Sequence, residues 1–180
     1  RLKFFTKFIL VFLIIFLAFL LLQKSPKILD QSRIKIVDNI GKNYLIRGSN
    51  PFANNLGERK FSYHELKKFI NKTLENSGQK TLEDFYLIDI SLLNIDGYFQ
   101  QVEEKIFFKK YPHLGQVKNF SEISPSLLLM GFSDYDFIYE ITKNYHEKID
   151  EILVQIRQDL QQQQDKPVII YVHCNAGRDR

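Results

Sequence analysis

The chain of 180 residues has little cysteine and only a mild net charge. Its single cysteine, Cys174, cannot form an internal disulfide, so nothing in the chain requires an oxidising compartment. Because no cluster of cysteines and histidines is present, we expect no structural zinc site, and we predict no metal or cofactor. The net charge is +4 and no basic patch is interleaved with aromatic residues, which argues against nucleic acid as a partner.

The overall amino-acid composition is typical of one globular domain. Hydrophobic residues make up 44% of the chain and charged residues 26%, which excludes a disordered class. A chain of this length can bury a core of ordinary size. The mild positive charge suits an anionic substrate or a membrane surface.

The longest apolar run covers residues 8–22 and has basic residues on both sides. A helix of this run spans about 22 Å, short of a ~30 Å hydrocarbon core, but including Phe4 and Phe5 brings residues 4–22 near the lower limit for a membrane-spanning helix. No small-x-small cleavage site follows. We therefore predict that residues 1–24 anchor the protein in a membrane. A cleaved signal peptide, which would leave the protein secreted, and a buried core helix are the alternatives, and the flanking charges leave the side of the membrane open.

The rest of the chain alternates between helix-like and strand-like segments. Ser62 lies three residues before Glu65, which is the spacing of a capping box, and Phe61 can pack on Leu66 beside it. Gly78 is placed to end the helix that starts there. The other predicted elements are strands near residues 34–37, at Tyr44–Ile46, at 85–90 and at Val168–Val172, and a long helix over 135–161.

The segment 91–131 has no clear hydrophobic period. We predict irregular structure there, with weak strands around Ile106–Phe108 and Leu127–Met130. Strands that alternate with helices are typical of an α/β layered fold, so we predict a central, largely parallel sheet flanked by helices. Residues 40–180 then form the domain, and residues 25–39 form a linker.

The chain ends in PVIIYVHCNAGRDR, which places its one cysteine next to an apolar strand. The strand Val168–Val172 delivers Cys174 to the carboxyl end of a sheet, where α/β folds bind their ligands. In the loop 175–180, Gly177 is free to take a positive φ, so successive N–H groups can point inward around an oxyanion. Arg180 adds a planar guanidinium that matches two phosphate oxygens. The stretch therefore predicts a phosphate-binding nest with a cysteine beside it.

A cysteine in such a nest is held as a thiolate. Lowering its pKa by about three units from ~8.5 corresponds to ~4 kcal/mol in favour of the anion. The thiolate can then attack a phosphorus atom bound in line with it. The alternative is a buried core thiol, the common state of a lone cysteine. However, a histidine before Cys174, a glycine three residues after it and an arginine six residues after it coincide at roughly one in ten thousand positions.

The pattern H-C-x-x-G-x-x-R in HCNAGRDR resembles the signature of the cysteine-based protein tyrosine phosphatase superfamily. This resemblance implies a tyrosine phosphatase-like fold, a cysteinyl-phosphate intermediate at Cys174 and a loop oriented by His173. It also implies that phosphate is bound by the guanidinium and the backbone amides of the loop, which consists of Asn175, Ala176, Gly177, Arg178, Asp179 and Arg180.

The upstream sequence is similar to the dual-specificity-like branch of this superfamily over residues 40–180. IRGSNP at 46–51 is similar to the opening strand and turn of that branch. FYLIDIS at 85–91 is similar to the strand that usually reads I-D-L-R, with Ser91 where the family often has arginine.

The leaving oxygen needs a proton from a carboxylic acid on a loop that faces the nest. The F-x-D pattern ending at Asp134 resembles that of phosphoinositide-hydrolysing members, and we rank Asp134 first, with a helix N-cap as its structural alternative. Asp179 ranks second, because myotubularin-like and some bacterial lipid phosphatases carry G-x-D-R there, and Asp136 ranks third. Asp150 and Asp159 lie inside the predicted helix, where we expect them to be solvated.

Together these features predict a phosphomonoester hydrolase that acts on phosphotyrosine, phosphoprotein or phosphoinositide substrates. Arg178 resembles a basic residue of phosphoinositide-hydrolysing relatives and would favour a multiply phosphorylated ring, although a surface arginine is the alternative. A second hypothesis is a non-catalytic phospho-ligand binder, which the intact Cys174 and Arg180 disfavour. A third is sulfur transfer, for which the loop is one residue too long by resemblance.

The chain begins with Arg1 and stops inside this loop, so we expect it to be a fragment. The family has serine or threonine at the next position and then a helix whose dipole supports the nest. Without that helix we expect the fragment itself to be inactive.

Overall fold

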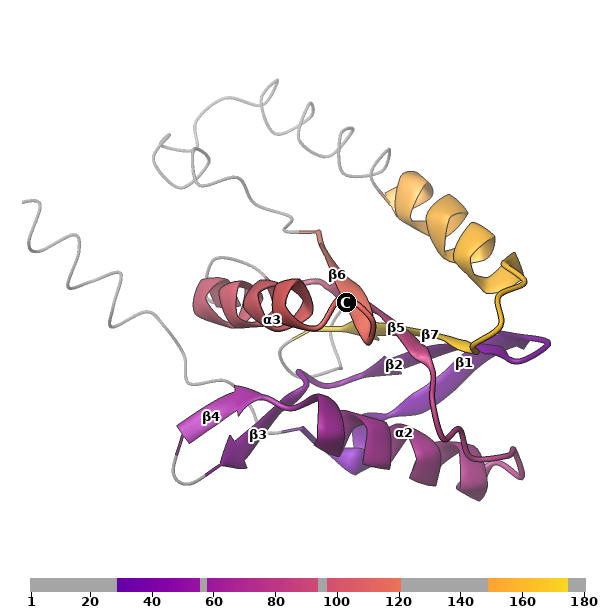
Figure 1. Ribbon diagram of the computed structural model, residues 1–180, viewed down its shortest axis with the longest axis horizontal. Coiled ribbons are helices and arrows are strands. Elements are labelled where there is room, and N and C mark those ends of the chain that lie inside the picture. Colours follow the sequence, from indigo (N-terminus) through magenta and orange to yellow (C-terminus); the bar gives the residue numbers. More distant parts are fainter. Residues whose placement is uncertain (1–28, 56–57, 94–96, 121–148, 175–180) are drawn as a thin grey trace, which may run out of the picture.

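The computed structural model describes residues 29–55, 58–93, 97–120 and 149–174. They form an α/β unit around a five-stranded sheet with the order β1-β2-β7-β5-β6 (Figure 1). The strands are β1 (Lys35–Ile40), β2 (Asn43–Gly48), β5 (Tyr86–Ser91), β6 (Gly115–Asn119) and β7 (Val168–His173). β7 is parallel to β2 and β5, β6 is parallel to β5, and β1 is antiparallel to β2. The predicted α/β fold with a largely parallel central sheet is confirmed.

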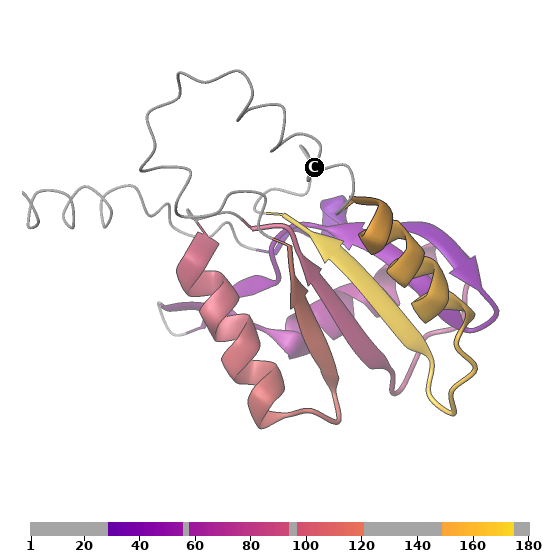
Figure 2. The same ribbon diagram turned by 90° about the horizontal axis from the view of Figure 1, so that it is seen from above.

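Helices cover both faces of this sheet (Figure 2). α2 (Tyr63–Asn76) and α3 (Tyr98–Lys110) contribute apolar side chains to a core on one face. Residues 149–161 are helical and pack on the opposite face through Ile156 and Leu160. The central strand β7 is therefore buried on both faces of the sheet, which is why its sequence is a continuous apolar run.

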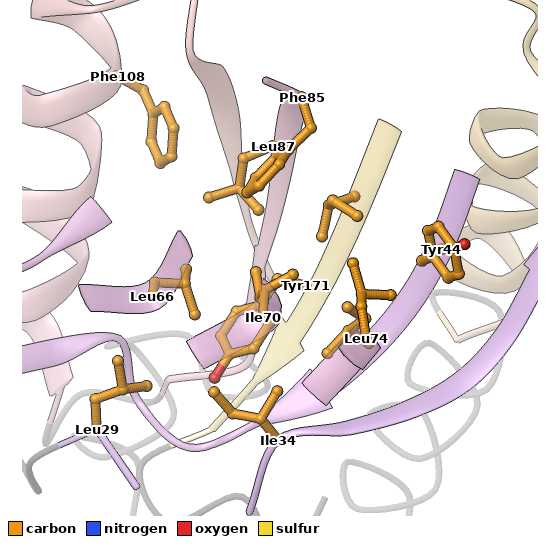
Figure 3. Close-up of a cluster of buried hydrophobic side chains, with 12 residues drawn as sticks. Leu29, Ile34, Tyr44, Leu66, Ile70, Leu74, Phe85, Leu87, Phe108 and Tyr171 are labelled. Atoms are coloured by element: carbon orange, nitrogen blue, oxygen red, sulfur yellow. The ribbon is translucent and has the colours of Figure 1, made fainter. Parts of the chain in front are cut away.

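Successive residues of β7 supply the two cores in turn. Ile169 and Tyr171 belong to the core under α2 and α3. Figure 3 shows Tyr171 in this core together with Leu87 and Ile70. Val168 and Ile170 belong to the core under the helix at 149–161. Since side chains alternate across a strand, His173 follows on the α2 and α3 face.

The helix α2 begins after its predicted N-cap and ends before its predicted glycine, but only one half of the capping box forms, because the N–H of Ser62 donates to the carbonyl of Pro51. The backbone N–H of Glu65 donates to the hydroxyl oxygen of Ser62, the N-cap residue. At the other end, Gly78 has φ 71°, and its N–H donates to the carbonyl of Glu75. The N–H of Gln79 donates to the carbonyl of Leu74, which completes a Schellman motif.

The helix α3 corrects one prediction for segment 91–131, since Ile106–Phe108 lies within a helix and not in a weak strand. The weak strand predicted around Leu127–Met130 lies outside the described residues. The buried face of α3 is mostly polar and consists of Gln100, Gln101, Glu104 and Phe108. Its exposed residues include three large hydrophobic side chains, Tyr98, Phe99 and Ile106. An apolar periodicity cannot reveal a helix that buries polar residues and exposes apolar ones. The edge strand β6 was also not predicted, because Val117 is its one apolar residue.

Residues before position 40 contribute to the folded unit. The range 25–39, predicted as a linker, contains Leu29 and Ile34, which are buried in the core, and most of β1. A 3-10 turn at Gln31–Arg33 precedes β1. A separate hairpin, β3 (Phe52–Asn55) and β4 (Glu58–Phe61), follows β2.

The predicted helix over 135–161 is present where the structure describes it, at residues 149–161. The expectation that Asp159 is solvated is wrong. Asp159 is buried, and its Oδ2 lies 2.9 Å from Nζ of Lys118, which extends from β6. Gln155 also donates to Asp159. Asp150 is exposed, as expected.

The predicted membrane anchor, residues 1–24, lies outside the described residues. Within the described ranges, no helix combines the length and the apolar character needed to cross a bilayer.

Candidate active site

The carboxyl ends of the parallel strands meet at one edge of the sheet. His173, the last residue of β7, is paired in register with Gly48 at the end of β2 and with Ser91 at the end of β5. Ser91 is in turn paired with Asn119 at the end of β6. Cys174 follows directly after β7, so the central strand of the sheet delivers it to the edge where α/β folds place their ligand sites.

Two of the predicted site residues belong to the described part of the chain. His173 and Cys174 are both buried, with exposed fractions of 1% and 6%. The remaining predicted residues lie outside the described ranges: Asp134, Asp136, Asn175, Ala176, Gly177, Arg178, Asp179 and Arg180. The phosphate-binding loop and the identity of the general acid therefore stay predictions.

Two acidic side chains outside the predicted site contact the imidazole of His173. Its Nε2 lies 3.1 Å from Oδ1 of Asp89 on β5 and 3.4 Å from Oε1 of Glu104 on α3. All three side chains are fully buried. None of these atoms has a hydrogen-bond partner within the described residues, so the contacts are identified by their short distances alone. We call Asp89, Glu104 and His173 the acid–histidine cluster.

Burial and charge together set the protonation of this cluster. Burial alone lowers the pKa of His173, but the two neighbouring acids, Asp89 more than Glu104, outweigh it and raise the pKa to about 9. Burial raises the pKa of Glu104 to about 8, the His173 imidazolium opposes this increase, and Asp89 adds to it. At neutral pH, His173 is therefore an imidazolium, Glu104 keeps its proton, and the Asp89 carboxylate balances the positive charge.

The same three side chains each offer one atom within 4.8 Å of the others, a separation that would also allow a shared cation. An imidazole that binds a metal through Nε2 is neutral and carries no proton on that atom. Nε2 lies 3.1 Å from Oδ1 of Asp89 and 3.4 Å from Oε1 of Glu104, which are the separations expected for a protonated ring between two acids. We therefore assign the cluster as an ion pair with a second, protonated acid.

Tyr171, two residues before His173, supports the imidazole from β7. The two rings stack with centroids 5.7 Å apart and an interplanar angle of 26°. The Tyr171 hydroxyl donates to the carbonyl of Ser49 over 2.6 Å. Gly48 leaves the space for this phenol, since a Cβ there would lie 2.1 Å from its oxygen. The Gly-Ser pair of the IRGSNP segment thus has a packing role at the site.

The N-terminal turn of α3, which precedes Glu104, is attached to the same edge of the sheet. The buried side chain of Asn50 donates to Oε1 of Gln100 over 3.0 Å. Gln101 donates through Nε2 to the carbonyl of Leu93, which follows β5. Gln100 and Gln101 lie about one turn before Glu104. Their two buried contacts therefore fix the position along the axis of α3 at which the Glu104 carboxyl group meets His173.

Sequence signals for the two acids differ in strength. Asp89 interrupts the apolar run of FYLIDIS, and a lone acid inside a buried strand is a recognisable signal of a special role. Glu104 lies beside Glu103 in a segment with no clear period, so the sequence had no signal for it. The cluster places a buried positive charge directly before Cys174, which is an arrangement that can stabilise a thiolate.

Comparisons with known proteins do not extend this description. No protein-family model, no curated protein and no solved structure matches the chain. Functional inference therefore depends on the motif at Cys174 and on the geometry around it.

Proposed function

We propose that the protein is a phosphomonoester hydrolase with a tyrosine phosphatase-like fold and Cys174 as its nucleophile. The main support is the position of Cys174, directly after the central strand of a largely parallel sheet and next to the buried side chain of His173. This position is where an α/β fold presents an anion-binding loop, and a nearby cation favours the thiolate that the chemistry needs.

The proposed reaction has two steps. The Cys174 thiolate attacks phosphorus, an S–P bond forms, and the P–O bond to the leaving oxygen breaks. The leaving oxygen takes a proton from a carboxylic acid, for which Asp134 is the first candidate and Asp179 and Asp136 are the alternatives. Water then gives a proton to the resulting carboxylate and attacks the cysteinyl-phosphate, the S–P bond breaks, and inorganic phosphate, the thiolate and the carboxylic acid are regenerated. Arg180 and the amides of residues 175–180 bind the phosphate oxygens throughout.

The proposed substrates are phosphotyrosine in proteins or phosphoinositides. Arg178 favours a substrate with more than one phosphate group, because it would add a second cation next to the loop. An anchor formed by residues 4–22 would keep the enzyme near a membrane, where a phosphoinositide headgroup is available.

Hydrolysis of an aryl phosphate by the full-length protein tests the proposal. Cys174→Ser should abolish turnover while phosphate binding survives, and acid-quenched wild-type protein should carry labelled phosphate on Cys174. Tyr44→Phe is a suitable control, since Tyr44 is also buried but lies at the opposite end of β2. Turnover that persists in Cys174→Ser would overturn the covalent mechanism. Phosphate binding without turnover in the wild type would favour the non-catalytic binder.

A further inference from the structure

We propose that Asp89 and Glu104 are positioning residues that hold His173 as an imidazolium against Cys174, so that β5 and α3 set the reactivity of the nucleophile. The inference rests on the proposed function, because it assigns these two acids a task in the same site. Neither acid is part of the motif at residues 173–180.

The geometry brings three separate elements to one imidazole ring. Asp89 reaches Nε2 from the neighbouring strand β5, and Glu104 reaches the same nitrogen from α3. On the third side, the ring of Tyr171 stacks on the imidazole. His173 is therefore held in one orientation immediately before the nucleophile.

The groups around His173 differ in charge and in role. The groups that face it are Asp89 from β5, Glu104 from α3, and Tyr171 and Cys174 from β7 and its end. The neighbouring Glu103 adds to the increase in the pKa of Glu104. Asp89 provides the counter-charge that keeps the ring protonated, whereas Glu104 at neutral pH provides a neutral polar contact. A Cys174 thiolate would be the second anion next to this cation, and each favours the other.

Folding alone does not account for this arrangement. Burying two acids and an imidazole is costly, and replacing such a group by apolar residues of similar volume is often neutral or stabilising. Helix α3 nevertheless turns Glu104, Gln100 and Gln101 inward and exposes Phe99 and Ile106. Helices that bury polar residues and expose apolar ones are expected at functional sites, where the buried polar groups serve the site and not the stability of the fold.

The rate of Cys174 alkylation by iodoacetamide, measured against pH in the full-length protein, tests the inference without any substrate. Asp89→Asn keeps the shape of the side chain but removes the counter-charge, and it should raise the apparent pKa of the thiol by about one unit or more. Glu104→Leu should also raise it, because the polar contact with Nε2 is lost. Glu104→Gln, which is neutral like the protonated acid, should restore a thiol pKa close to that of the wild type.

The matched control is Asp159→Asn. Asp159 is also a buried, ion-paired acid, but it contacts Lys118 on the opposite face of the sheet. It should leave the thiol pKa unchanged even if it lowers stability. Circular dichroism identifies variants that remain folded. If Asp89→Asn does not fold, the two Glu104 variants decide the test. We expect the alkylation profile of Glu104→Gln to match the wild type and that of Glu104→Leu to differ from it.

Three results would overturn the inference. The first is a folded Asp89→Asn protein with an unchanged thiol pKa, and the second is a Glu104→Leu protein that matches Glu104→Gln. The third is a wild-type thiol pKa that shifts on treatment with a chelator, because the cluster would then hold a metal and not a proton. Phosphatase activity is measured separately, so a protein that shows the expected thiol shifts but hydrolyses no phosphoester contradicts the proposed function alone.

Discussion

The hydroxyl of Tyr171 lies 2.6 Å from the carbonyl oxygen of Ser49, and this contact joins the central strand β7 to the turn after β2. Both groups are buried, and no water is needed to satisfy them. The same phenol ring stacks on His173. One aromatic side chain therefore links the turn, the sheet and the imidazole beside the proposed nucleophile.

Tyr171→Phe should lower the free energy of unfolding by about 1–3 kcal/mol, because the Ser49 carbonyl loses its buried donor. Urea denaturation measures the change. Tyr44→Phe is the comparison, since its hydroxyl makes a longer contact of 3.2 Å with the side chain of Gln79 in a partly buried position. We expect Tyr44→Phe to cost less, and an equal cost for the two variants would contradict the prediction.

Gly48→Ala should destabilise the protein by about 3 kcal/mol, because the new Cβ would overlap the Tyr171 phenol and neither β2 nor β7 can move freely. The double variant Gly48→Ala/Tyr171→Leu should recover part of that loss, since the shorter side chain removes the overlap. A double-mutant cycle by urea denaturation measures the coupling. Strictly additive effects would show that the overlap is not the cause.

Lys118→Met should lower stability by about 2 kcal/mol, because it leaves the buried Asp159 carboxylate without its positively charged partner, although Gln155 still donates to it. The control is Lys166→Met, which breaks a closer pair, 2.6 Å between Nζ and Oδ2 of Asp84, whose side chains are both 51% exposed. An exposed pair contributes about 0–1 kcal/mol, so this control should have little effect. Thermal unfolding ranks the two variants, and the reverse order would refute the argument.

Stability should decrease as the pH rises from neutral to 9. Folding raises the pKa of His173 to about 9 and that of Glu104 to about 8, so the folded state binds these protons more tightly than the unfolded chain does. The contribution of Glu104 is complete below its unfolded pKa near 4.5 and is lost through pH 8, and that of His173 is complete below 6.5 and is lost through pH 9. Each proton changes the free energy by about 1.4 kcal/mol per pH unit where it applies.

Urea midpoints at several pH values between 6 and 9 measure this slope. The slope should be steepest between about pH 6.5 and 8, where both groups release protons on unfolding. Glu104→Gln removes one of the two groups and should flatten it. A wild-type stability that stays level or increases over this range would disagree with the assigned protonation of the cluster.

For the proposed hydrolase, Asp134→Asn should slow reactions with poor leaving groups by about 10²-fold or more, with a smaller effect on nitrophenyl phosphate. Asp150→Asn serves as the control, since Asp150 is exposed and is not a candidate acid, and Asp179→Asn and Asp136→Asn test the second and third candidates. Rates of both substrates in the full-length protein measure the difference. If Asp179→Asn shows the leaving-group dependence and Asp134→Asn does not, the ranking of the acids is reversed.

Several local features of this protein follow from its sequence alone. The capping residues Ser62 and Gly78 bound α2 because they satisfy backbone groups within a few residues of themselves. The run Val168–Val172 forms a strand because it is apolar on both faces. The candidate nucleophile Cys174 and its neighbour His173 are recognisable because the motif is contiguous in the chain.

Tertiary structure decided the surroundings of that motif. Asp89, Glu104 and His173 meet because β5, α3 and β7 pack together, and no local pattern specifies which acid faces which nitrogen. Helix α3 was missed for a related reason, since it buries its polar side and exposes apolar residues. Hydrophobic periodicity predicts an element only where apolar side chains form its buried face. Buried polar residues are instead stabilised by partners from other elements, which are determined only when the sheet and the helix are assembled.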